Sequence, residues 1–159
     1  IATCPHADCF SWLTRGWLSG SNVTQEMRAA IVDWLVQVFS SYVERSVLIH
    51  SLDTTDLSLS DITLHLAVAN FDLIICETEV EEEEVQLLAL VCLSLAAKTE
   101  EDCPPAPELL LPLSGDIYDK ADLARVEKEA IKTQVEAEEE HSGALPPLPT
   151  PASGATVQQ

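Results

Sequence analysis

Four charged residues stand at positions where amphipathic helices usually carry apolar side chains. Apolar residues follow Arg28 three, four and seven positions later, so on a helix its guanidinium would lie among them. Asp72 and Glu127 border or lie within later apolar stripes, and Lys98 directly follows two alanines. Because an unpaired charge is costly to bury, each side chain in such a place needs a group of opposite charge. The chemistry that these residues offer is therefore ion pairing and recognition.

The spacing narrows the choice of partners. We predict that Arg28 pairs with Asp72 on another helix, since Asp33 lies five residues along the same helix and points elsewhere. Glu127 has two candidate partners, which are Lys98 within the chain and a cation on another protein. Lys98 is also explained by its place in the last turn of a helix, where the helix dipole favours a positive charge.

The other reactive side chains do not form a complete site. Cys4, His6 and Cys9 would supply half of a zinc site, but no second pair of ligands follows at a useful spacing. The acidic run 77–84 lacks the alternating oxygen ligands and the glycine of a calcium loop, and negative charge ahead of a helix is explained by the dipole. The sequence also has no nucleophile elbow or phosphate loop. We therefore predict no metal, no cofactor and no enzymatic activity.

Four predicted helices position the charged residues. The central one spans 27–42, where apolar residues recur every three or four positions, and either Thr24 or Asn22 can cap its start. A second helix is predicted over 62–76 with Asp61 as its cap. The third, 85–100, is apolar on nearly every side and belongs in the middle of a bundle. The fourth follows Asp119, which caps it.

The segments around these helices are predicted to be irregular. Residues 1–20 form an N-terminal segment with room for a short helix, and 43–61 reads as a long loop because it lacks sustained periodicity. Prolines interrupt 101–115, so it cannot hold a long helix. The stretch 136–159 is acidic and then rich in proline, a composition typical of a disordered tail.

Composition restricts the classes of function. The chain has 159 residues, enough for one domain and a tail, with 27 acidic and 8 basic residues and a formal charge of -19. Such a charge repels phosphate backbones and anionic lipids, so we predict no nucleic-acid binding and no membrane binding. The longest apolar run, 87–97, is shorter than the ~18 residues that span a bilayer. Five cysteines, an odd number, indicate reduced thiols and an intracellular location.

Successive stretches of the chain resemble the cyclin box of the A- and B-type cyclins over roughly residues 7–135. The matching motifs, in order, are MRAAIVDWLVQV, TLHLAVANFD, VQLLALVCLSLAAKTEEDCPP and YDKADLARVEKEAIK. The resemblance implies an all-α, five-helix bundle with the cyclin box at 21–135. After Lys132, acidic and proline-rich sequence stands where the fifth helix belongs, so that helix is expected to be degraded or missing. The chain is similar to an atypical or truncated member of the family.

The resemblance implies a regulatory subunit that binds and activates a cyclin-dependent kinase, located in the nucleus, the cytoplasm or both. The family's signature residues fall on Arg28, Asp72, Leu87, Lys98 and Glu127. In the family, the first two form a structural ion pair and the last two bind the kinase near its mobile αC helix. The neighbouring Thr99 and Ile131 would share the kinase-binding surface.

Two departures from the family pattern support an alternative. Thr99 and Glu136 stand where the family has aromatic residues, which reduces apolar contact with a kinase. The alternative is a non-activating interaction scaffold that keeps the cyclin fold.

The resemblance also implies a patch that docks substrates. Its residues here are Met27, Ala30, Ile31, Trp34, Gln37 and Gln86. Ala30 is small, and Gln37 replaces the carboxylate that receives a substrate arginine, so the docking of Arg-x-Leu motifs is disfavoured.

Overall fold

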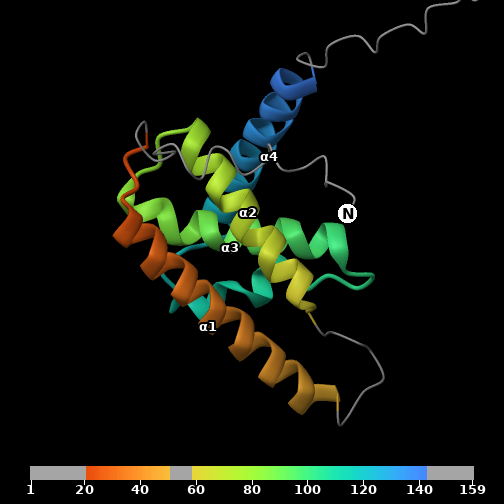
Figure 1. Cartoon of the computed structure of the whole chain (residues 1–159). Coiled ribbons are helices and arrows are strands. Elements are labelled where there is room, and N and C mark those ends of the chain that lie inside the picture. Colours follow the sequence, from red (N-terminus) through yellow and green to blue (C-terminus); the bar gives the residue numbers. More distant parts are fainter. Residues whose placement is uncertain (1–20, 51–58, 143–159) are drawn as a thin grey trace, which may run out of the picture.

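A computed structural model describes residues 21–50 and 59–142, and within these ranges it is helical and contains no strand (Figure 1). Its α-helices are α1 (Gln25–His50), α2 (Asp61–Glu77), α3 (Val85–Glu100) and α4 (Lys120–Ser142). Three short 3-10 helices connect them, namely η2 (Glu82–Glu84), η3 (Pro107–Leu109) and η4 (Leu111–Ser114). The predicted all-α fold class is confirmed. Helix α4 is the last α-helix among the described residues, and 1–20, 51–58 and 143–159 lie outside them.

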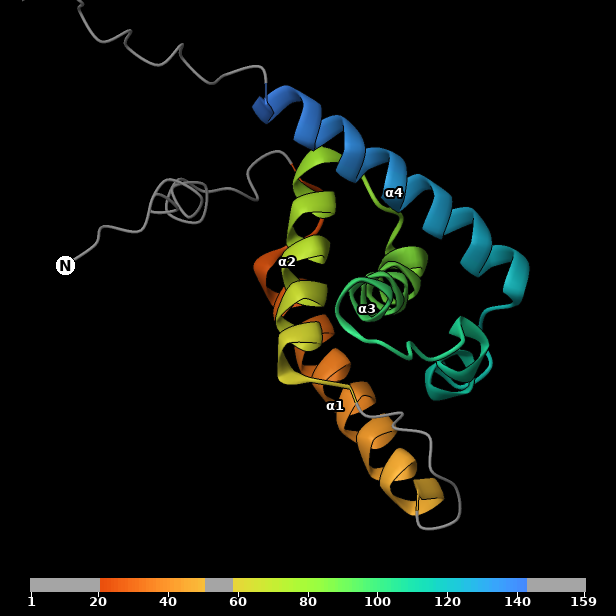
Figure 2. The ribbon, with the colours of Figure 1, turned by 90° about the vertical axis from the view of Figure 1, so that its right-hand side faces the viewer.

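Helix α3 forms the middle of the bundle. In Figure 2 it is seen nearly end-on, with α2, α4 and the segment of η3 and η4 arranged around it. The four consecutive residues 87–90 point in different directions around α3, and each has at most 3% of its surface exposed. A helix that is apolar on all sides is stable in water only when neighbours cover every side. The predicted central place of 85–100 is confirmed, and the signature residue Leu87 is part of the core.

Helix starts are fixed by side-chain caps. The Thr24 hydroxyl accepts a hydrogen bond from the Met27 amide at 3.2 Å, so Thr24, rather than Asn22, caps α1. At α2 the cap is Ser60, whose hydroxyl accepts from the Thr63 amide at 3.4 Å. The prediction that Asp61 caps this helix is wrong by one residue, because Asp61 is already helical and Ser60 has the extended backbone of a cap.

Before α4 the predicted cap is confirmed. Asp119 accepts a hydrogen bond from the Asp122 amide at 2.8 Å, and the Asp122 carboxylate accepts from the Asp119 amide at 3.2 Å. This reciprocal arrangement satisfies two of the amides that have no partner within the first turn.

Two helices are longer than predicted. Helix α1 continues to His50, so 43–50 is helix and not loop. The apolar stripe runs on through Phe39 and Tyr42 to Ser46, which is buried and donates its hydroxyl proton to the Val43 carbonyl at 2.8 Å. Helix α4 continues to Ser142, past the boundary at 136 where the disordered tail was predicted to begin. Alanine and glutamate, which make up most of this extension, have high helix propensity.

None of the helices in the described part of the chain has the length and apolarity needed to cross a membrane.

Candidate functional site

The ammonium group of Lys98 and the carboxylate of Glu127 form an ion pair between α3 and α4. Lys98 lies in the last turn of α3, and Glu127 lies two turns into α4. Their side chains keep 40% and 22% of their surface exposed. Of the two partners predicted for Glu127, the structure contains the one within the chain. Both groups also remain open to a second molecule.

An exposed apolar strip on α4 continues from this pair. Ile131 and Val135 follow Glu127 by one and two helical turns, and they are 44% and 48% exposed. On the other side, Thr99 is exposed and its hydroxyl donates to the Leu95 carbonyl at 3.0 Å. We call Lys98, Thr99, Glu127 and Ile131 the α3–α4 surface. It combines one cation, one anion and apolar area, which suits the recognition of another protein.

A second ion pair ties α1 to α2 and is much less exposed. The Arg28 guanidinium donates to both oxygens of Asp72, with Nε to Oδ1 at 2.6 Å and Nη2 to Oδ2 at 2.7 Å. Only 6% of the Asp72 side chain and 27% of the Arg28 side chain are exposed. The hydrogen bond to Asp72 raises the pKa of Arg28 above its ordinary value. The pairing predicted from the sequence is confirmed, and its place between two helices makes it structural.

The thiol of Cys76 lies one turn after Asp72 on α2. Burial, with a smaller contribution from the negative charge of Asp72, raises its pKa from the ordinary value of 9.0 to about 11. Cys92 on α3 is fully buried, and burial raises its pKa strongly. Thiols held in this protonated form are poor nucleophiles and poor metal ligands.

An open groove lies between α1, the start of α3 and the residues that precede α4. Its volume is about 430 Å³, and it brings together Met27, Ala30, Ile31 and Gln86 from the predicted docking patch. Trp34 and Gln37 do not line it. Trp34 is partly buried against the core and Gln37 is exposed. The structure therefore unites four of the six patch residues.

Several residues of this groove were missed by the sequence analysis. Glu82 and Glu83 stand on the groove together with Ile117, which is 67% exposed, and Tyr118. The Tyr118 hydroxyl donates to the Glu83 carbonyl at 2.8 Å, which holds the two segments together. No local pattern in the sequence indicates this contact, because it joins residues that are 35 positions apart.

The described residues contain no group of three or more His, Cys, Asp or Glu side chains placed to hold a metal ion. The half-site of Cys4, His6 and Cys9 lies outside the described residues. What the described part of the chain offers chemically is recognition through the α3–α4 surface and the groove.

Comparison with known proteins gives consistent matches. A family model described as the cyclin N-terminal domain matches residues 44–133. The chain is 29% identical over 123 residues to the G2/mitotic-specific cyclin-B3 of Mus musculus, which covers 77% of this chain and 8% of that protein. It is 32% identical over 111 residues to Cyclin-A1-4 of Oryza sativa subsp. japonica, covering 70% of this chain and 27% of the relative. Cyclin-A2 of Gallus gallus is also 32% identical over 111 residues, with 70% and 24% covered. The chain therefore spans about a quarter or less of the length of these relatives.

Proposed function

The chain belongs to the cyclin family, and on that premise we propose that it is a regulatory subunit that binds and activates a cyclin-dependent serine/threonine kinase in cell-cycle control. The observation that carries the proposal is the exposed Lys98–Glu127 ion pair beside the apolar side chain of Ile131. The proposed place of action is the nucleus, the cytoplasm or both. Catalysis would belong to the kinase.

The α3–α4 surface supplies two kinds of contact for such a partner. Lys98 has ammonium protons that remain free to donate to kinase carbonyls, and Glu127 can accept from kinase amides. Ile131 and Val135 add apolar area that is removed from water on binding, worth roughly 25 cal/mol per Å². Polar groups at the centre of an apolar contact fix its register, because a misplaced partner would leave them unpaired.

Activation would be a shift of population. A cyclin bound beside the αC helix of the kinase holds that helix inward, where its glutamate pairs with the lysine that positions the ATP phosphates. The inactive arrangement then loses population because it lacks the cyclin contact. The buried Arg28–Asp72 pair contributes indirectly, by holding α1 against the α2 helix that packs on α3 and α4.

The test is binding to purified cyclin-dependent kinases, followed by an assay of histone phosphorylation. We expect the wild-type chain to bind one of these kinases and raise its activity. The double variant Lys98→Ala/Glu127→Ala is expected to lose binding. The matched control is Glu84→Ala/Arg125→Ala, which removes another exposed pair between α4 and the start of α3, 2.6 Å long, and should bind normally. Full binding by the first variant would overturn the proposed surface.

A second candidate function is a non-activating interaction scaffold. It is favoured by Thr99, which is exposed and polar, and by Glu136, which lies 3.7 Å from Lys132 in an exposed ion pair and adds no apolar contact. In the same assay, a complex that depends on Lys98 and Glu127 but leaves kinase activity unchanged would favour the scaffold over the activator.

A further inference from the structure

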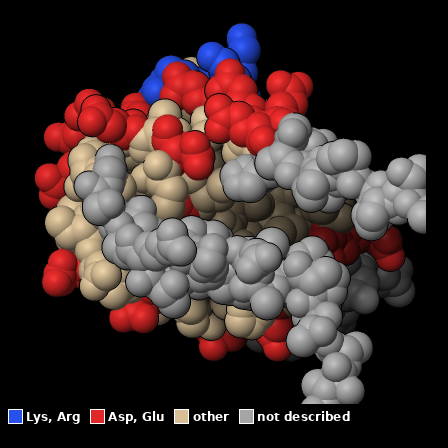
Figure 3. Space-filling view, turned by 45° about the horizontal axis from the view of Figure 1, so that its top comes forward, with Lys and Arg blue, Asp and Glu red and all other residues tan. Residues whose placement is uncertain are grey.

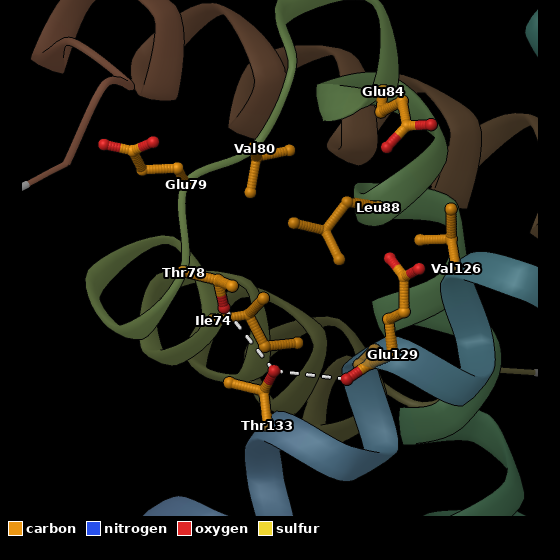
Figure 4. Close-up of a pocket in the computed structure, with 10 residues that line it drawn as sticks. Ile74, Thr78, Glu79, Val80, Glu84, Leu88, Val126, Glu129 and Thr133 are labelled. Carbon is orange, nitrogen blue, oxygen red and sulfur yellow. Dashed lines mark hydrogen bonds between the residues drawn. The ribbon is translucent and has the colours of Figure 1, made fainter.

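A small pocket lies between the end of α2, the linker to α3 and the side of α4 that faces the bundle (Figure 4). Its volume is about 60 Å³. The floor consists of Ile74, Leu88, Val126 and Ala130, each of which is at most 5% exposed. Buried apolar side chains therefore line a space larger than the ~15 Å³ that a single water needs.

The rim of the pocket carries negative charge and no positive charge among its lining residues. Glu79 stands on the linker and Glu129 on α4, and in Figure 4 the Glu129 carboxylate lies beside Val126 and points toward Glu84. Glu84 already binds the Arg125 guanidinium at 2.6 Å. The structure thus combines an apolar floor with the Glu84 and Glu129 carboxylates at one side of the opening, while the Glu79 carboxylate points away from the other lining side chains in Figure 4.

Hydroxyl groups close the remaining side. Thr78 and Thr133 lie 3.4 Å apart through their hydroxyl oxygens, joining α2 to α4. The Thr133 hydroxyl also lies 3.1 Å from the Glu129 carbonyl, to which it can donate. These contacts connect the elements that form the pocket, so its shape follows from the packing of α2 against α4.

We propose that this pocket is a docking site for a lysine side chain in a basic segment of a partner protein. The four methylene groups of lysine fit against the apolar floor, and the ammonium group then lies beside the Glu129 carboxylate. A neutral apolar side chain would leave the rim without a counter-charge, and an acidic one would be repelled. The formal charge of -19 adds to this preference for a cation, and acidic side chains border much of the face that Figure 3 shows, while basic ones gather at one edge.

The lysine pocket is separate from the α3–α4 surface. Leu88 and Lys98 are ten residues apart on α3, a distance of roughly 15 Å along the helix. On α4 the pocket residues Val126, Ala130 and Thr133 lie on a different side from Glu127 and Ile131. The proposal goes beyond the proposed function, since it holds whether or not the chain activates a kinase.

The experiment is an NMR titration of the whole ¹⁵N-labelled chain with a short, terminally blocked peptide of glycine, serine and several lysines. Amide signals of Thr78, Val80, Ala130 and Thr133 are expected to shift. The same peptide with norleucine in place of lysine should cause no shift. Equal shifts with both peptides, or lysine-dependent shifts that avoid these residues, would overturn the proposal.

Two variants, each with a matched control, test the two parts of the pocket. Glu129→Gln should weaken binding about tenfold through the lost charge-assisted contact. Glu44→Gln removes the same charge from an exposed position on α1 and should weaken binding less than about twofold. An equal loss in both variants would show that only overall charge matters and would overturn the site.

Ala130→Leu should fill the pocket and abolish binding without changing the charge, while Ala124→Leu at an exposed position of the same helix should have no effect. A thermal unfolding curve accompanies each variant. If Ala130→Leu proves unfolded, Glu129→Gln on the exposed rim still decides the question. Retained lysine binding in a folded Ala130→Leu variant would overturn the proposal.

Lys98→Ala/Glu127→Ala should bind the peptide like the wild type, which separates failure of the lysine pocket from failure of the kinase proposal.

Discussion

The two interhelical ion pairs of this chain have the same chemistry but different surroundings. Arg28 and Asp72 pair through two hydrogen bonds, with only 6% of the Asp72 side chain exposed. Lys98 and Glu127 pair through one hydrogen bond, with 40% and 22% of their side chains exposed. Burial makes the first pair a condition of the fold, because an unpaired carboxylate at that place would lack solvation.

The exposed pair contributes little to folding for the same reason. Water reaches Lys98 and part of Glu127 in the folded chain, so their contact replaces much of an existing solvation. A pair that the fold does not need is free to serve another purpose, and here it lies beside exposed apolar side chains of α4. The difference between the pairs predicts opposite results for stability and for binding, and four measurements test it.

The largest expected effect is that of Arg28→Ala. This change leaves the Asp72 carboxylate buried without its guanidinium, so the free energy of unfolding should fall by about 3 kcal/mol in urea titrations followed by circular dichroism. Arg28→Met/Asp72→Leu, which removes both charges, is the control and should recover most of the loss. A loss below about 1 kcal/mol for the single change would mean that this pair is no more structural than an exposed one.

The thiol of Cys76, one turn from the buried pair, gives the next effect. Its pKa is raised from 9.0 to about 11 by burial first and by Asp72 second. At pH 8 its thiolate fraction is therefore about 100-fold below that of an ordinary thiol. Alkylation by iodoacetamide, read by peptide mass mapping, should be slower by up to that factor.

The raised pKa of Cys76 also makes the free energy of unfolding depend on pH. Below pH 9 the thiol is protonated in the folded and in the unfolded chain. Above pH 9 the unfolded chain loses the proton first, so the contribution of Cys76 to stability is lost between pH 9 and about 11. Lys98→Ala/Glu127→Ala should leave the alkylation rate unchanged. Labelling of Cys76 in the wild type at the rate of a free thiol peptide would contradict the enclosed setting of the buried pair.

The sequence predicted the Arg28–Asp72 pair and gave Lys98 as one of two candidate partners for Glu127, because a charge on an apolar stripe requires a partner. Helical spacing disfavoured Asp33 as the partner of Arg28, and Asp72 was proposed because it borders the apolar side of another helix. The sequence determined the Lys98–Glu127 pair less well, because the helix dipole by itself explains a lysine in the last turn of a helix. Only the packing of α3 against α4 selects its contact with Glu127.

Local sequence patterns did not predict the features that depend on contacts between distant residues or on the ends of helices. The stretch 43–61 was predicted to be a loop because it lacks sustained periodicity, yet Ser46 is buried in α1 and its hydroxyl is bonded within the helix. The Asn22 side-chain amide binds both the carbonyl and the amide of Val80, at 2.6 and 3.1 Å, across 58 residues. Such a contact forms only when the helices pack together. The placement of the carboxylates at the groove and at the lysine pocket depends on the same packing.

The cap of α4 provides a smaller test, because this helix carries Glu127 and the exposed apolar strip. Asp119→Ala removes the acceptor of the Asp122 amide and should lower the free energy of unfolding by about 1 kcal/mol. Asp119→Asn keeps an oxygen acceptor and serves as the control. If the alanine variant proved as stable as the wild type, the start of α4 would not depend on its cap, and the position of Glu127 would be set by packing alone.

The smallest expected effect on stability is that of the exposed pair itself. Lys98→Ala/Glu127→Ala should change the free energy of unfolding by less than about 1 kcal/mol, because it removes both charges together and water reaches Lys98 and part of Glu127 in the folded chain. The sharper variant exchanges the two charges, Lys98→Glu/Glu127→Lys. It keeps an ion pair between α3 and α4, so stability should stay near that of the wild type, but it presents the wrong charge at each position to a bound protein. Kinase binding measured by calorimetry should then be lost in a fully folded chain. If the variant with exchanged charges bound the kinase normally, the charges of Lys98 and Glu127 would not take part in binding. The pair would then be structural, like Arg28 and Asp72, despite its greater exposure.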